Sequence, residues 1–172
     1  MNTFVAALSF CLSAATVLWA GCDLSGLTGS ERILIYDVVD ADTPRAVPLL
    51  TVFSDGRVRV AMPGEARDDH IGQSDVRAMF QAIETAGLAR LTSEEIAGSF
   101  SADGAQDGRV PINRVADGAT SFVVLDVPGC EAHLSVANSA FHALAHPEAE
   151  ALQSFREIEL RLLNIVTAVQ TR

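Results

Sequence analysis

The stretch Thr120–Val127 (TSFVVLDV), followed by Pro128-Gly129 and then Cys130–Val136 (CEAHLSV), decides the fold class. Its first segment is rich in β-branched and aromatic residues, which favour strands. Its second segment alternates apolar and polar residues, as a strand with one solvated face does. The Pro-Gly pair between them predicts a tight turn. The stretch therefore predicts an antiparallel hairpin that buries one face.

The residues before this hairpin predict further strands. Residues 31–40 and 47–53 are β-branched and apolar, and residues 57–60 alternate polar with apolar side chains. Ser54-Asp55-Gly56 is a strong signal for a hairpin turn between the last two of these strands. Residues 110–115 predict one more, weaker strand.

Two amphipathic helices are predicted. One begins at Ser74 and ends before Gly87, and the other runs from Pro147 to about Val169. Residues 93–97 predict a short helical turn, and residues 65–73 predict a polar loop. Apolar residues recur at helical spacing in both helices. They are Val76, Met79, Phe80 and Ile83 in the first helix, and Leu152, Phe155, Ile158, Leu162, Ile165, Val166 and Val169 in the second.

The predicted order is therefore βββ-α-βββ-α within a single domain of residues 31–172. Hairpin links between the strands favour an α+β fold, in which an antiparallel sheet has two helices packed on one face. A domain of this length can bury roughly 70% of the surface that its unfolded chain exposes.

The N-terminal segment predicts export. Residues 1–21 contain no Asp, Glu, Lys or Arg, and almost all of them are apolar or small. This pattern is typical of a signal peptide and is slightly short for a transmembrane helix, which needs about 20 apolar residues. Leu18–Cys22 (LWAGC) resembles a bacterial lipobox, although Trp19 stands where that motif usually has Leu. The resemblance implies cleavage before Cys22 and attachment of lipid to its sulfur, with acyl chains such as palmitate holding the protein to the bilayer.

The residues around Cys22 leave an alternative open. Residues 22–30 are small and polar enough for a flexible tether, and Asp23 resembles a signal for retention at the inner membrane. If Cys22 carries no lipid, it is free to form a disulfide with Cys130 in an oxidising compartment, which would make the protein a soluble periplasmic domain. The two outcomes exclude each other.

The charge of the chain argues against nucleic acid as a partner. The sequence has 22 acidic and 12 basic residues, for a net charge of −10. Binding to phosphate backbones requires clustered Lys and Arg, whereas the basic residues here are scattered.

Candidate metal ligands form only incomplete patterns. His142 and His146 are spaced to share one face of a helix, as a zinc site requires, but the Glu of an HExxH motif is missing. Glu148 and Glu150 are the candidate third ligands. The acidic residues of a second group do not follow the spacing of a calcium loop, and a solvated acidic surface is the simpler interpretation. That group consists of Asp68, Asp69, His70, Asp103 and Asp107.

Candidate catalytic groups are also incomplete. Cys130 and His133 lie three residues apart on a predicted strand, so their side chains point to opposite faces and His133 cannot activate the thiol. The sequence contains no G-x-S-x-G, G-x-G-x-x-G or P-loop motif.

Several segments together resemble small exported bacterial domains of unknown function, and are loosely similar to emfourin-type protease-inhibitor domains. They are Leu50–Val58 (LTVFSDGRV), the helix that ends in Ala86-Gly87-Leu88, the hairpin 120–136 and the closing helix. The resemblance transfers no functional residue, and it implies a protein that is not an enzyme. The sequence motifs indicate no cofactor.

We therefore expect a membrane-tethered lipoprotein of the cell envelope that binds a protein partner. This expectation predicts an exposed apolar patch or an open sheet edge, without a convergent polar pocket. A module that senses a small ligand or a metal would instead require a real cavity. An enzyme would require a pocket with perturbed ionisable groups.

Overall fold

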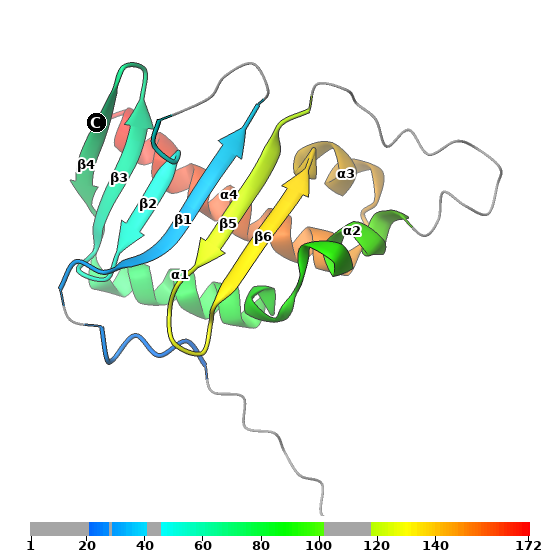
Figure 1. Cartoon of the computed structure of the whole chain (residues 1–172), viewed down its shortest axis with the longest axis horizontal. Coiled ribbons are helices and arrows are strands. Elements are labelled where there is room, and N and C mark those ends of the chain that lie inside the picture. The colour runs from blue at the N-terminus through cyan, green and yellow to red at the C-terminus, as the bar shows by residue number, and fades with distance from the viewer. Residues whose placement is uncertain (1–20, 28, 41–45, 102–117) are drawn as a thin grey trace, which may run out of the picture.

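The computed structural model describes residues 21–27, 29–40, 46–101 and 118–172. In these residues, six strands form one antiparallel sheet in the order β4-β3-β2-β1-β5-β6 (Figure 1). The strands are β1 (Arg32–Val39), β2 (Leu50–Phe53), β3 (Arg57–Met62), β4 (Glu65–His70), β5 (Thr120–Leu125) and β6 (Ala132–Ala137). The helices are α1 (Gln73–Thr85), the short 3-10 helix η1 (Leu88–Arg90), α2 (Ser93–Ser101), α3 (Ser139–Ala145) and α4 (Glu150–Gln170).

Strand β1 lies at the centre of the sheet and pairs with strands from both halves of the chain. Leu34 lies opposite Val52 of β2 on one side and opposite Leu125 of β5 on the other. Gly56 has a φ of 88° in the β2–β3 turn, and Gly64 has a φ of 85° in the β3–β4 turn. Both values lie in the left-handed region that glycine adopts without steric cost, which explains two tight turns in succession.

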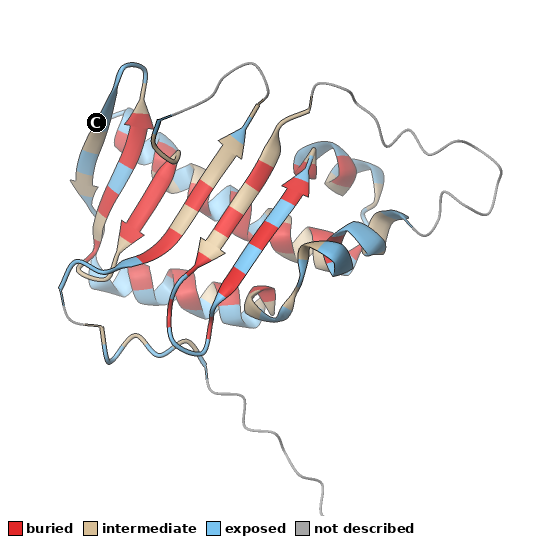
Figure 2. Ribbon diagram, in the orientation of Figure 1, coloured by how far each residue is buried: buried red, intermediate tan, exposed pale blue. Residues whose placement is uncertain are grey.

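Helices α1 and α4 cover one face of the sheet, and Figure 1 shows both of them behind it. The alternation of buried and exposed residues along β6 and along the helices follows from this arrangement (Figure 2). The buried side chains of α1 and α4 pack against those of the strands to form one core. No helix in the described ranges crosses the opposite face of the sheet.

The structure confirms the α+β class and the antiparallel sheet, but the predicted order βββ-α-βββ-α is wrong. Residues 65–70, predicted as loop, form the edge strand β4, which pairs with β3 along its whole length. Its polar sequence misled the prediction because an edge strand carries charged side chains that a buried strand would not. The candidate strand 110–115 lies outside the described residues.

The predicted pair of helices is also incomplete, because the described residues contain four α-helices. Helix α2 extends to Ser101 rather than ending at Ala97, and α3 was not predicted as an element. Helix α4 starts at Glu150, not at Pro147. Within the described residues, no helix is both long and apolar enough to cross a membrane.

The N-terminal segment runs along the end of the sheet at which β5 ends and β6 begins. The backbone N–H of Asp23 donates to the carbonyl of Pro128 at 2.9 Å, and a disulfide joins Cys22 to Cys130. Leu24 and Leu27 pack against the core. Residues 21–27, most of them in the segment interpreted as a tether, therefore contact the domain directly.

Candidate binding site at helices α3 and α4

A buried carboxylate lies where α4 crosses β1, β5 and the start of α3. Glu159 of α4 is only 1% exposed. Its Oε1 accepts hydrogen bonds from the hydroxyl of Tyr36, at 3.1 Å, and from the hydroxyl of Ser121. Its Oε2 accepts from the hydroxyl of Ser139 at 2.7 Å and from Nη1 of Arg156 at 2.6 Å. Four elements of the fold therefore meet at one negative charge.

This set of donors explains how the charge of Glu159 is tolerated in the core. A buried carboxylate is expensive unless it is both paired and hydrogen-bonded. Each oxygen here accepts two hydrogen bonds, and Arg156 supplies the compensating positive charge. Because its acceptor sites are filled, Glu159 is poorly suited to take a proton from a substrate.

Tyr36 is equally unsuited to proton transfer. Burial raises the pKa of its hydroxyl far above the usual value, and the negative charge of Glu159 and the hydrogen bond to it add to this effect. Tyr36 therefore stays protonated and acts as a fixed hydrogen-bond donor. Its role in the cluster is to hold the Glu159 carboxylate in place.

A pocket of about 380 Å³ opens above this cluster. Its polar wall includes the guanidinium of Arg156, whose side chain is 23% exposed, and the side chain of Asn138. Its remaining walls are largely apolar and come from both halves of the domain. They are formed by Val38, Ala119, Ala140, Phe141 and Leu163. The pocket is thus apolar with a few convergent polar groups, as ligand sites commonly are.

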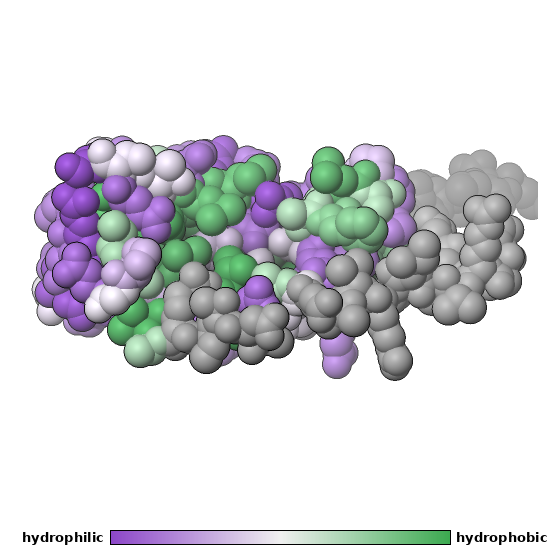
Figure 3. Space-filling model, turned by 90° about the horizontal axis from the view of Figure 1, so that it is seen from above, coloured by the Kyte–Doolittle hydropathy of each residue, from purple (hydrophilic) through white to green (hydrophobic). Residues whose placement is uncertain are grey.

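The elements that line this pocket also carry exposed apolar side chains, of which Phe141 lines the pocket itself. Among the described residues, the large apolar side chains with the greatest exposure are Val39 at 43%, Phe141 at 50%, Leu144 at 86% and Leu160 at 46%. Three of these four lie on α3 and α4, and Val39 ends β1. Figure 3 views the molecule from the side on which β1 ends and α3 lies, and hydrophobic residues form much of the surface coloured there. Such a concentration marks an interaction surface more often than scattered apolar residues do.

The two histidines predicted as zinc ligands lie beside this surface. His142 is buried and stacks on Phe100 with ring centroids 4.4 Å apart, while the ring of His146 lies 6.2 Å from that of His142. Glu148 contacts His146 at 3.4 Å. His142, His146 and Glu148 nevertheless do not bring three ligand atoms together closely enough to hold a metal ion, and no other metal-binding side chain in the described residues completes the set. The two rings instead form part of an aromatic stack, and Phe141 packs edge-on against His142.

The other predicted site residues are held in separate contacts. Asp68 accepts two hydrogen bonds from Arg59, which lower the pKa of its carboxyl, and Asp69 pairs with Arg172 at 2.9 Å. Asp103 and Asp107 lie outside the described residues. His133 is exposed on β6, whereas Cys130 is buried before that strand begins.

Cys22, Cys130 and Glu84 form the one group of three possible metal ligands found in the described part of the chain. Both sulfur atoms are engaged in the disulfide, so neither is available to a metal ion. The carboxylate of Glu84 accepts a hydrogen bond from the backbone N–H of Cys22. This group is therefore an attachment point for the N-terminal segment.

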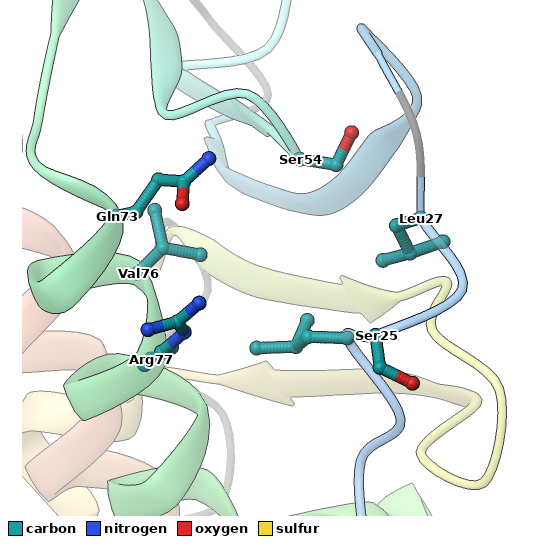
Figure 4. A pocket seen from close by; sticks show the side chains of 7 residues that line it. Ser25, Leu27, Ser54, Gln73, Val76 and Arg77 are labelled. Atoms are coloured by element: carbon teal, nitrogen blue, oxygen red, sulfur yellow. The ribbon is translucent and has the colours of Figure 1, made fainter.

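A second, smaller pocket of about 210 Å³ lies between this segment and the start of α1. Figure 4 shows Gln73, Val76 and Arg77 of α1 facing Leu27 and the neighbouring residues across it. The hydroxyl of Ser54 in its wall already donates to the carbonyl of Gly29 at 2.6 Å. The pocket gathers no cluster of charged groups, and we assign it no function.

The carboxylate cluster is not among the predicted sites, although the sequence contains a signal for it. The apolar stripe predicted in α4 includes Phe155 and Leu162, and Glu159 lies between them at helical spacing on the same face. A charged residue on a buried stripe must find partners, which identifies a polar site in the core. The identities of those partners, Tyr36, Ser121 and Ser139, depend on tertiary contacts that no spacing reveals.

We predict that Glu159→Ala strongly destabilises the domain, because it leaves the Arg156 charge and three hydroxyl groups without their acceptor. The free energy of unfolding should fall by about 3–5 kcal/mol in urea titrations. The matched control is Glu157→Ala on the same helix, where the exposed pair with Arg161 contributes less than about 1 kcal/mol. Equal, small losses for both variants would contradict a structural role for the cluster.

The second prediction concerns pH. Burial, with a smaller effect from the nearby charge of His146, lowers the pKa of His142 below its ordinary 6.5. The unfolded chain then binds more protons than the folded protein, so stability should decline as pH falls from about 6.5 toward the lower folded pKa. His142→Phe should weaken that decline in thermal melts between about pH 7.5 and pH 5, while His133→Phe should retain it. An unchanged slope in the first variant would exclude His142 as its source.

No protein-family model matches the chain, and the comparisons with curated proteins and with solved structures found no match. The resemblance to emfourin-type inhibitor domains therefore stays an expectation.

Proposed function

We propose that this protein is an exported, non-enzymatic binding domain of the cell envelope, and that its partner is another protein. The observation that carries this proposal is the apolar surface around the pocket between α3, α4 and the end of β1. Exposed Phe141, Leu144 and Leu160 are costly in water and gain favourable burial when a partner covers them.

Other features support recognition through this surface. Strand β4 carries a charged sequence, EARDDH, and an edge of this kind resists pairing with a strand of another chain. At the opposite edge, the hydroxyl of Ser93 in α2 accepts a hydrogen bond from the backbone N–H of Ser135 in β6. Side chains of the partner, packed onto the apolar surface, are therefore a better-supported mode of binding than strand addition.

The polar cluster beneath the pocket also favours binding over catalysis. The sequence predicts a binding surface without a convergent polar pocket, whereas polar groups do converge at this site. Their hydrogen bonds are directed mainly at Glu159, so they fix the position of Arg156 and the shape of the pocket. A rigid, preorganised pocket of this kind suits recognition.

Export leaves two exclusive forms for Cys22, because a disulfide and a lipid thioether use the same sulfur. The Cα atoms of Cys22 and Cys130 lie 5.0 Å apart, within the range that disulfides require. This distance supports the disulfide-bonded form, which we favour. The lipid-bearing form, with Asp23 as a sorting signal, stays the competing prediction, and in both forms the domain acts outside the cytoplasm.

Intact mass of the protein taken from its own host distinguishes the two forms. We expect a lipid-free mass with a start close to Cys22, which gains about two daltons on reduction as the disulfide takes up two hydrogens. A mass for residues 22–172 plus several acyl chains, unchanged by reductant, would instead establish the lipoprotein and rule out the disulfide.

Photo-crosslinking in the host tests the binding surface. A benzoylphenylalanine placed at Phe141 or at Leu160 should give an adduct of one defined mass. The matched control is the same probe at Glu131, which is exposed beyond the opposite end of β5. Adducts that are absent at Phe141 and Leu160, or that appear equally at Glu131, would contradict the proposed surface.

A further inference from the structure

We infer that the pocket between α3 and α4 takes the free C-terminus of a partner polypeptide, with an apolar last residue in the pocket and its carboxylate on Arg156. This inference rests on the proposed function and adds the chemistry of the partner to it. Arg156 keeps N–H donors available, the charge of Glu159 is balanced by several groups, and the pocket has room for one residue.

Arg156 is fixed in place but only partly used. Its Nη1 donates to Glu159, and it makes no other hydrogen bond within the described residues. A guanidinium has five N–H donors in a planar fork, so most of those of Arg156 remain available in the pocket wall. A carboxylate is the group that such a fork binds best, because two parallel hydrogen bonds match its two oxygens.

The charge balance at Glu159 permits a second carboxylate on Arg156. Three neutral hydroxyl groups, those of Tyr36, Ser121 and Ser139, already stabilise Glu159 in addition to the guanidinium. Arg156 is therefore not the only group that stabilises the buried charge of Glu159. A ligand carboxylate on its exposed side would lie between water and the guanidinium, which separates it from Glu159.

The apolar part of the pocket limits what precedes the carboxylate. A volume of about 380 Å³ is at the small end for ligand sites and suits one residue with its adjoining backbone. Phe141 and Leu163 offer apolar surface to a side chain of that residue. The side chain of Asn138 makes no hydrogen bond within the described ranges and lines the same pocket, where it can bind a backbone amide of the peptide.

At the rim of the pocket, Gly118 lies close to the side-chain amide of Asn138. A methyl group added at Gly118 would lie 1.5 Å from Oδ1 of Asn138, so the side chain of Asn138 would have to move to admit a larger residue there. Asn138 itself has a φ of 51°, a left-handed conformation that asparagine tolerates better than most residues.

The test compares peptide pairs that differ only in their C-terminal group. Fluorescein-labelled Ala-Ala-Phe, Ala-Ala-Leu and Ala-Ala-Val are prepared as free acids and as carboxamides, and fluorescence polarisation measures their binding to the protein purified from its host. We expect at least one free acid to bind, and its carboxamide to bind at least about tenfold more weakly. Equal binding of the two forms, or no binding by any free acid, would overturn the inference.

Two conservative variants connect the effect to Arg156. Arg156→Lys keeps the charge beside Glu159 but removes the planar fork, so the ratio between acid and carboxamide should fall to about threefold or less. Arg161→Lys changes an exposed arginine on the same helix and should leave the ratio intact. Thermal melts verify that both variants fold. An unchanged ratio in Arg156→Lys would overturn the assignment of the carboxylate to this residue.

The outcomes separate this inference from the proposed function. Crosslinks at Phe141 together with no peptide binding would overturn the C-terminal carboxylate and leave the protein-binding surface standing. Selective binding of the free acids without any crosslink at Phe141 or Leu160 would support the carboxylate site and contradict the larger surface. Octanoate is tested as a competitor beside the unlabelled peptide. If both displace the labelled acids at the same concentration, the assignment of a peptide ligand is overturned, because the pocket would then recognise an acyl carboxylate.

Discussion

One buried negative charge governs this end of the molecule. Glu159 brings together α4, β1, β5 and the start of α3, and each of these elements supplies a donor to its two oxygens. An apolar residue at this position would pack with less desolvation cost, but it would impose no direction on its neighbours. The carboxylate accepts only donors in defined places, so it determines where α3 begins against the sheet and how Arg156 is oriented. The position of α3 and the orientation of Arg156 in turn determine the shape of the pocket above Glu159.

In the proposed binding mode, the apolar surface and the polar cluster make complementary contributions. Apolar residues such as Phe141 and Leu160 provide burial, which is strong but does not discriminate well between partners. Arg156 adds a directional group that favours a carboxylate over other ligand groups, since its planar guanidinium can donate two parallel hydrogen bonds to the two oxygens. The aromatic stack of Phe100, His142 and His146 supports Phe141 from below, and a buried neutral histidine in that stack makes this region sensitive to acid. The surface that we propose for binding and the histidine with a lowered pKa therefore share one set of contacts.

Much of the fold could be predicted from the sequence because local patterns were unambiguous where one face is buried. The alternation in β6 and the apolar stripe of α4 depend only on periodicity, and both were found. Strand β4 was missed because its charged residues match a loop in composition, and only pairing with β3 makes it a strand. The site could not be assembled from sequence for a similar reason. Tyr36, Ser121 and Glu159 are up to 123 residues apart and meet only through the crossing of β1 and α4.

The placement of the Cys22–Cys130 disulfide has a mechanical consequence. The disulfide follows one end of β5, whereas the pocket lies at the end where β5 begins and β1 finishes. A partner that pulls on the pocket while the N-terminal side is held would therefore stretch the sheet along its strands. The hydrogen bonds between antiparallel strands run perpendicular to that direction and would share the load in shear, all at once, rather than opening one after another as in unzipping.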